Sequence, residues 1–213
     1  MKKNLVLFSA LFVLFAVPVI AVAGNPTAQP ATNPAAEDKT PPSYDMKGQS
    51  MVDLQDMHKK MVALATAIPA EKYTWRPEAG ARSVSEVFLH VTAANYNITS
   101  MMTGITPVAA YKVDGFESST TDKAKIIEQL DKSYAFAEAA LQGMSNADFA
   151  RPEKKLGPDA NSGDVIYILM VHNHEHFGQS IAYARVNGIT PPWTVEAQKK
   201  AAAAKGGNTP KQD

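Results

Sequence analysis

The sequence contains no cysteine among its 213 residues, which excludes several kinds of site at once. Without cysteine there is no disulfide, no thiolate metal ligand, no cysteine nucleophile and no lipid-modified amino-terminal cysteine. An excess of charge is also lacking, since 21 basic residues balance 21 acidic ones. A chain with neither net positive charge nor a basic patch lacks the electrostatic footprint of a nucleic-acid-binding protein. Histidine therefore remains as the strong nitrogen ligand for any metal ion.

The first 23 residues have the pattern of a secretory signal peptide. Two lysines precede an uncharged apolar run from Leu5 to Ile20, and Ala21-Val22-Ala23 forms a small-residue cleavage site. The alternative is an uncleaved membrane anchor, but the run falls short of the roughly 20 residues that span a bilayer, and Pro18 interrupts it. We expect an exported protein, periplasmic or secreted, with no membrane contact after cleavage and 19 basic against 21 acidic residues.

Composition divides the rest of the chain into one core and two flanking segments. Residues 24–50 carry five prolines and almost no large apolar side chains. Residues 194–213 have no apolar face to dock, and we expect at most a frayed helical turn or two there. Neither segment can bury enough apolar surface to offset the entropy of ordering, so we expect both to be disordered. The segment 51–193 has the size of one domain with one core.

Apolar residues within 51–193 recur at helical spacing almost throughout. Ser83 and Glu86 form a capping box at the start of the second helix, and Gly143 and Gly188 supply expected helix ends. The spacing predicts four helices over residues 51–68, 83–103, 121–143 and 163–187.

Four long helices without a convincing strand predict an all-α protein built as a four-helix bundle. The links 105–120 and 144–162 are longer than the turns of a minimal bundle. We therefore expect at least one of them to be a crossover connection.

Three of the five histidines fall within the segment His172-Asn173-His174-Glu175-His176. At about 100° per residue, His172 and His176 lie only about 40° apart on a helix, whereas His174 lies about 200° from His172. The pair shares the stripe that faces the bundle interior, where an unpaired imidazole is costly. Two histidines one turn apart can present two nitrogens to one metal ion, with a third from a facing helix.

The spacing leaves the third ligand open between His58 and His90. His90 sits at the edge of its helix's apolar stripe, whereas His58 sits nearer the centre of its own. For His58 alone we favour an ordinary hydrogen-bonded core histidine, and for the whole set the spacing leaves metal binding and core packing equally open. The zinc-peptidase pattern H-E-x-x-H fails here. Glu175 points about 100° away from His176, so we expect it to support the site from behind the ligands or to lie on the surface, rather than to act as a general base.

Two blocks of sequence resemble the DinB-like (YfiT-like) superfamily. The first comprises residues 68–77 and 83–91, and the second comprises residues 172–179 and 183–192. The resemblance implies a four-helix bundle with an unusual connection order that holds a divalent metal, commonly zinc or nickel, on three histidines. Carried over position by position, these ligands are His90, His172 and His176.

The resemblance also marks the neighbours of the last histidine. Many members have arginine where this chain has Phe177, so any contact made by that arginine is absent. Gln179 is retained one turn beyond His176, and we expect it to hydrogen-bond a ligand or to orient a metal-bound water.

Three histidines leave a divalent ion an open position, which suits Lewis-acid chemistry. Characterised relatives include transferases and isomerases that use the cytoplasmic thiols bacillithiol or mycothiol, and export separates this chain from that pool. A metal-dependent hydrolase is therefore as well supported as a thiol transferase, acting on an unknown small molecule. The alternatives are a non-catalytic bundle that binds a metal or a small ligand, and a scaffold that uses its tails. Several relatives pair, so a homodimer is also among the expectations.

Overall fold

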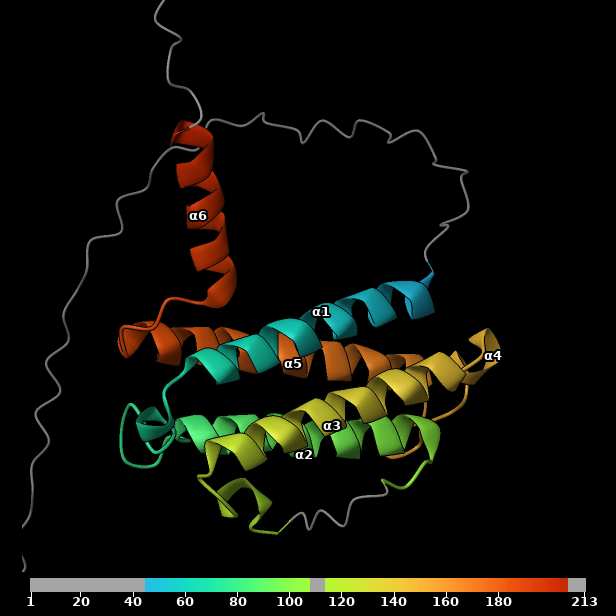
Figure 1. The fold of residues 1–213 in the computed structure, drawn as a ribbon. Helices are drawn as coiled ribbons and strands as arrows, with labels where there is room; N and C mark the ends of the chain where they lie inside the picture. The colour runs from blue at the N-terminus through green and yellow to red at the C-terminus, as the bar shows by residue number, and fades with distance from the viewer. Residues whose placement is uncertain (1–44, 108–113, 207–213) are drawn as a thin grey trace, which may run out of the picture. The chain divides into compact units, whose positions relative to one another are not determined.

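The computed structural model describes residues 45–107 and 114–206, which form helices and turns with no β-strand among them (Figure 1). The prediction of an all-α fold is confirmed. The expected signal peptide, 1–23, lies outside the described residues, as does most of the expected linker. The long helices are α1 (Met46–Ala67), α2 (Val84–Thr103), α3 (Lys123–Gly143) and α5 (Ser162–Val186). The shorter elements are the 3-10 helices η1 (Ala70–Lys72) and η2 (Phe116–Ser118), and helices α4 (Asn146–Phe149) and α6 (Pro192–Gly206).

The four long helices pack so that α1 and α2 each make their main contacts with both α3 and α5. α1 and α2 therefore lie diagonally opposite in the bundle, and so do α3 and α5. The predicted crossover is confirmed for the link 144–162, which joins the diagonal pair α3 and α5. The link 105–120 joins neighbours instead. The link between α1 and α2 also joins diagonally opposite helices, so it is a second crossover. The loop lengths did not predict it.

Helices α2 and α5, which carry His90, His172 and His176, both begin at residues whose side chains cap the helix. At α2, Ser83 Oγ accepts from the Glu86 N–H at 3.3 Å and Glu86 Oε2 accepts from the Ser83 N–H at 2.7 Å, which confirms the predicted capping box. At α5, the Asn161 side chain accepts from the first turn. Gly188 follows α5 with φ 76°, in the left-handed conformation expected of it. These caps fix the start of both helices.

Helix α1 begins earlier than the predicted boundary at residue 51. It starts at Met46, inside the segment expected to be a disordered linker, and the Asp45 side chain caps it by accepting from the Gly48 N–H at 3.0 Å. Lys47 Nζ donates to the carbonyl of Gln142 at 2.8 Å, at the carboxyl end of α3. A cap and a cross-bundle cation thus extend the helix where composition alone predicted a flexible segment.

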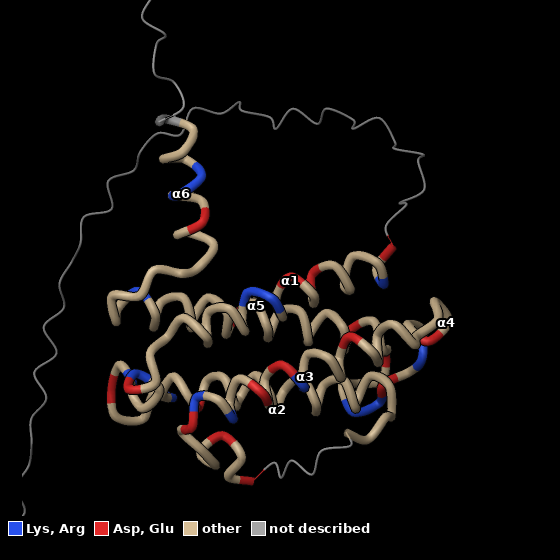
Figure 2. Tube along the Cα trace, viewed as in Figure 1, with Lys and Arg blue, Asp and Glu red and all other residues tan. Residues whose placement is uncertain are grey.

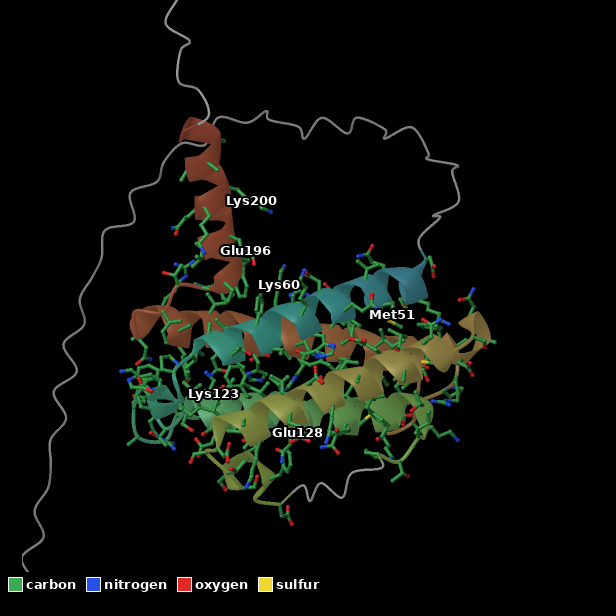
Figure 3. The ribbon with its side chains drawn as sticks, viewed as in Figure 1. Met51, Lys60, Lys123, Glu128, Glu196 and Lys200 are labelled. Atoms are coloured by element: carbon green, nitrogen blue, oxygen red, sulfur yellow. The ribbon has the colours of Figure 1, made fainter. Side chains whose placement is uncertain are left out.

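The ends of α3 also differ from the prediction. The helix begins at Lys123 after the cap Asp122, and Gly143 is its last helical residue rather than a left-handed cap. The chain leaves the helix through Met144 in an extended conformation, with its side chain buried. Lys123 Nζ donates to the carbonyls of Thr66 and Ile68, both at 2.7 Å, at the end of α1 (Figure 3).

The segment 194–213, expected to be disordered, contains most of helix α6. Pro192 stands at its first position, where the missing N–H costs nothing. Trp193 packs on Phe177 of α5 with ring centroids 5.2 Å apart, and the alanines and lysines that follow have high helix propensity. Packing at one end and propensity along the rest account for a helix that has no apolar stripe.

A buried polar network fixes the rotation of α5. The Tyr134 hydroxyl donates to Asn173 Oδ1, and Asn173 Nδ2 donates to Asn95 Oδ1 at 3.0 Å. All three residues are buried within a core of apolar side chains from the four long helices. Because buried polar groups are costly when unpaired, the network selects one rotation of α5. That rotation turns His172 and His176 toward α2.

Charged residues of both signs are interspersed along the helices rather than gathered by sign (Figure 2). This distribution matches the balanced composition of the whole chain. Among the described helices, none combines the length and the apolar character needed to cross a bilayer.

Candidate metal centre

Three histidines from two neighbouring helices converge at one point of the bundle. His90 comes from α2, and His172 and His176 come from α5, with one ligand atom of each within 4.8 Å of the others. The ring centroids lie 4.5 Å apart for His90 and His176, 4.5 Å apart for His172 and His176, and 4.9 Å apart for His90 and His172. We call this set the histidine cluster.

A carboxylate fixes the proton on His90. Glu117, carried by η2, accepts from His90 Nδ1 at 2.6 Å. Because an ionised carboxylate can only accept, Nδ1 must carry the proton, and Nε2 is left with its lone pair facing the cluster. Arg82 Nε donates to Glu117 at 2.7 Å and holds the carboxylate in place. Burial acts to raise the pKa of Glu117, but the hydrogen bonds from Arg82 and His90 outweigh it and the pKa is lowered.

A chain of hydrogen bonds fixes His176 in the same way. His176 Nδ1 donates to Gln179 Oε1 at 2.8 Å, Gln179 Nε2 donates to the Tyr183 hydroxyl at 3.1 Å, and that hydroxyl donates to the Arg82 carbonyl at 3.2 Å. The carbonyl at the end can only accept, so it sets the direction of the whole chain. His176 Nε2 therefore keeps its lone pair for the cluster. In the structure Gln179 thus contacts a histidine of the cluster.

His172 is the member of the cluster without an outer partner. Its Nδ1 is buried and makes no hydrogen bond within the described residues. Burial, together with the neighbouring His176 and His90, lowers the pKa of His172 to about 4. Burial also lowers the pKa of His176. Both rings are therefore neutral at neutral pH, the form in which imidazole binds a metal.

The spacing of the nitrogens fits a divalent ion. His90 Nε2 and His172 Nε2 lie 3.0 Å apart. Two nitrogens at about 2.0–2.1 Å from a tetrahedral zinc ion would lie roughly 3.3 Å apart. Two lone pairs at this separation repel unless a proton or a cation lies between them. The donor set and its spacing could therefore hold a divalent metal ion.

The other two histidines lie outside the cluster. His174 Nε2 faces Asp53 at 2.9 Å on the surface, as its angular position predicts. His58 Nδ1 lies 2.7 Å from Glu138 Oε1 and its Nε2 lies 2.9 Å from Asp131 Oδ1, so a carboxylate engages each nitrogen of the ring. This agrees with the hydrogen-bonded role favoured for His58. Glu175 is exposed, as expected.

Sequence reasoning missed Glu117 and Arg82. Glu117 lies in the link before α3, 27 residues beyond His90, and no periodic pattern joins the two. Arg82 stands just before the capping residue Ser83, where a surface position is the ordinary expectation. The helical spacing places Tyr183 on the same face as His172 and His176. Its hydrogen bond to the Arg82 carbonyl depends on the tertiary fold and could not be predicted.

The family comparison covers the three histidines of this site. No curated protein matches the chain. A family model described as the DinB superfamily matches residues 53–180, which is more than half of the sequence and includes the histidine cluster and Gln179. The all-helical bundle and the pair of histidines one turn apart agree with that match. The chain therefore belongs to the DinB superfamily.

Proposed function

We propose that this DinB-superfamily chain is an exported protein that binds one divalent metal ion, zinc or nickel, through His90, His172 and His176. The observation that carries the proposal is the convergence of three imidazoles with one ligand atom each within 4.8 Å of the others. Glu117 and Gln179 hold the Nδ1 protons of two of the rings, so the Nε2 lone pairs are directed inward. Such outer partners orient ligands and raise their basicity.

We further propose that the metal-bound protein is a hydrolase acting on a small molecule. A divalent ion with three protein ligands keeps a coordination position open and supplies Lewis-acid chemistry, which polarises a carbonyl or phosphoryl oxygen and makes water nucleophilic at neutral pH. The cluster residues would bind the ion, while Arg82 and Tyr183 would keep Glu117 and Gln179 in place.

The export pattern of residues 1–23 supports water over a thiol as the nucleophile. Cytoplasmic low-molecular-weight thiols, which characterised relatives use, would not be available outside the cytoplasm. Mass spectrometry of the protein recovered from the producing cells tests this step, because cleavage after Ala23 removes a segment of known mass. An intact amino terminus would make the thiol transferase the better reading of the same centre.

Metal content in matched histidine variants tests the site. We expect about one divalent ion per chain by elemental analysis of the purified protein. His176→Ala should lower metal affinity at least about a hundredfold, because two ligands cannot replace three. His174→Ala is the control, since His174 lies on the same helix and pairs with Asp53 outside the cluster. Equal metal content in both variants would show that the ion is held elsewhere.

Activity is then tested on simple probes. We expect the metal-loaded chain to hydrolyse a panel of activated esters and phosphate esters, and we expect chelator or His176→Ala to remove that activity. Cleavage or transfer that requires an added thiol would favour the transferase. A chain that holds the ion but acts on none of the probes, with and without thiol, would support a metal-binding bundle without catalysis.

A further inference from the structure

A cavity lies on the opposite face of α5 from the histidine cluster. It has a volume of about 730 Å³, lies between the first half of α1 and the first two thirds of α5, and includes none of the three cluster histidines. Cavities of about 300–1,000 Å³ are typical of sites for small organic ligands. The walls include Met46 and Asp53 on α1, and Tyr167, Val171, His174 and Glu175 on α5.

The apolar wall of this cavity is unusually exposed. Tyr167 is 69% exposed, Val171 is 45% exposed and Met46 is 42% exposed, although each could bury its side chain against a ligand. Single exposed apolar side chains are ordinary on a protein surface, whereas several around one concavity mark a binding site. Methionines at 46 and 170 add flexible, polarizable walls that adapt to varied ligands.

The cavity is polarised from one end to the other. Tyr167, Val171 and Glu175 follow one another at intervals of four residues, so they form a row along one face of α5. The row runs from an aromatic ring through an aliphatic side chain to a carboxylate over about 12 Å. α1 repeats the order, because Met46 and Asp53 lie seven residues apart along the other wall. Both helices thus place apolar groups at one end and a carboxylate at the other.

The acidic end has an unbalanced charge. Asp53 is paired with His174 at 2.9 Å, whereas Glu175 makes no hydrogen bond or ion pair within the described residues. The cavity wall contains no lysine or arginine. A cation at this end would gain attraction from Glu175, and an anion would meet repulsion from both carboxylates.

We propose that this cavity binds a small amphiphile whose apolar body lies along Tyr167 and Val171 and whose protonated amine faces Glu175. The ring of Tyr167 provides an apolar surface, and the length of the row matches a chain of about eight carbons. The distribution of apolar and acidic side chains selects this ligand class, and no histidine of the cluster lines the cavity.

Binding of three matched eight-carbon probes to the full chain tests the proposal. The probes are octylammonium, octanol and octanoate, each below its micelle-forming concentration, with binding followed by titration in two-dimensional amide NMR spectra. We expect octylammonium to bind about fivefold more tightly than octanol, and octanoate to bind more weakly than octanol. Glu175→Gln should remove the advantage of octylammonium and leave the affinity for octanol unchanged.

A filling substitution and its control locate the site. Val171→Trp should abolish binding of octylammonium and octanol, because the larger ring occupies the cavity. Val186→Trp is the matched control, since Val186 lies on the same helix, is 73% exposed and is not part of the cavity wall. Both replaced side chains are exposed, so the fold should persist, and circular dichroism checks this.

Three outcomes would overturn the proposal. Equal affinity for the three probes would mean that charge plays no part in recognition. Loss of binding in Val186→Trp as well as Val171→Trp would indicate partition onto the surface in general. If no probe binds and sedimentation shows a dimer that Val171→Trp dissociates, then a second copy of the chain covers this face instead.

Discussion

The bundle holds histidines in two polar environments, and they differ in what each imidazole nitrogen faces. In the histidine cluster, His90 and His176 each give one Nδ1 proton to an outer acceptor and direct the other nitrogen toward the remaining rings. His58, which joins α1 to α3, faces carboxylates with both nitrogens. In the first arrangement one nitrogen of each ring is left free for a metal, and in the second both nitrogens are engaged by carboxylates.

This difference indicates that the outer partners of His90 and His58, as well as their positions, decide whether a ring nitrogen is left free to bind a metal. One carboxylate on one nitrogen, as at His90, fixes a proton there and frees the second nitrogen. At His58 a carboxylate faces each nitrogen, so the ring links two helices and neither nitrogen is free for a metal. The number of carboxylates around the ring therefore distinguishes His90 from His58.

Among the partners that surround the two kinds of histidine, the largest predicted effect comes from removing the outer acceptor of His90. Glu117→Ala should lower metal affinity about ten- to a hundredfold, because His90 loses the contact that fixes its proton and orientation. A competitive titration against a chromophoric chelator measures this change. Glu117→Gln keeps an accepting oxygen and should retain most of the affinity.

The control for Glu117→Ala is Glu138→Ala, which removes a carboxylate from His58 in the same way. It should leave metal affinity unchanged. Equal losses in the two variants would mean that the effect is one of general stability, and the distinction between the two environments would fail.

The next effect is on stability in acid. The pKa of His172 is about 4 in the folded protein against an ordinary value of 6.5, chiefly because of burial. Between these values the unfolded chain takes up a proton that the folded chain resists, so stability falls as the pH drops through this window. For the metal-free protein we expect a contribution of about 2 kcal/mol between pH 7 and pH 4.

Urea unfolding of the chelator-treated protein and of His172→Asn across this pH range tests the effect. The variant lacks the titrating ring, so its stability should fall less steeply than that of the original chain. Parallel curves for the two proteins would contradict the lowered pKa of His172.

Much of the fold and part of the site could be predicted from the sequence, for reasons that are local. The interval of four residues between His172 and His176 and the Ser83 capping box are short-range patterns that a helix converts directly into geometry. The predicted start of α1 was wrong because Lys47 is held by a carbonyl at the end of α3. Composition alone does not reveal such a contact.

The outer partners of the cluster could not be predicted for the same reason. Glu117 meets His90 only because the link before α3 folds back onto α2, and Arg82 meets Glu117 only once both loops are in place. By contrast, Gln179 lies three residues from His176 and was identified, although as a contact to a ligand or a bound water rather than to the ring. Contacts between residues close in the sequence could thus be predicted, whereas contacts between distant residues could not.

The smallest predicted effect concerns His58 and completes the comparison. His58→Ala should destabilise the protein by about 1 kcal/mol, because Glu138 and Asp131 lose their shared partner and the Tyr134 ring loses the stacked imidazole 4.9 Å away. His58→Phe keeps the stacking and should cost less. Both variants should retain full metal content, measured beside thermal unfolding. Loss of metal in either one would mean that the linkage of α1 to α3 supports the histidine cluster, and the two environments would then be coupled.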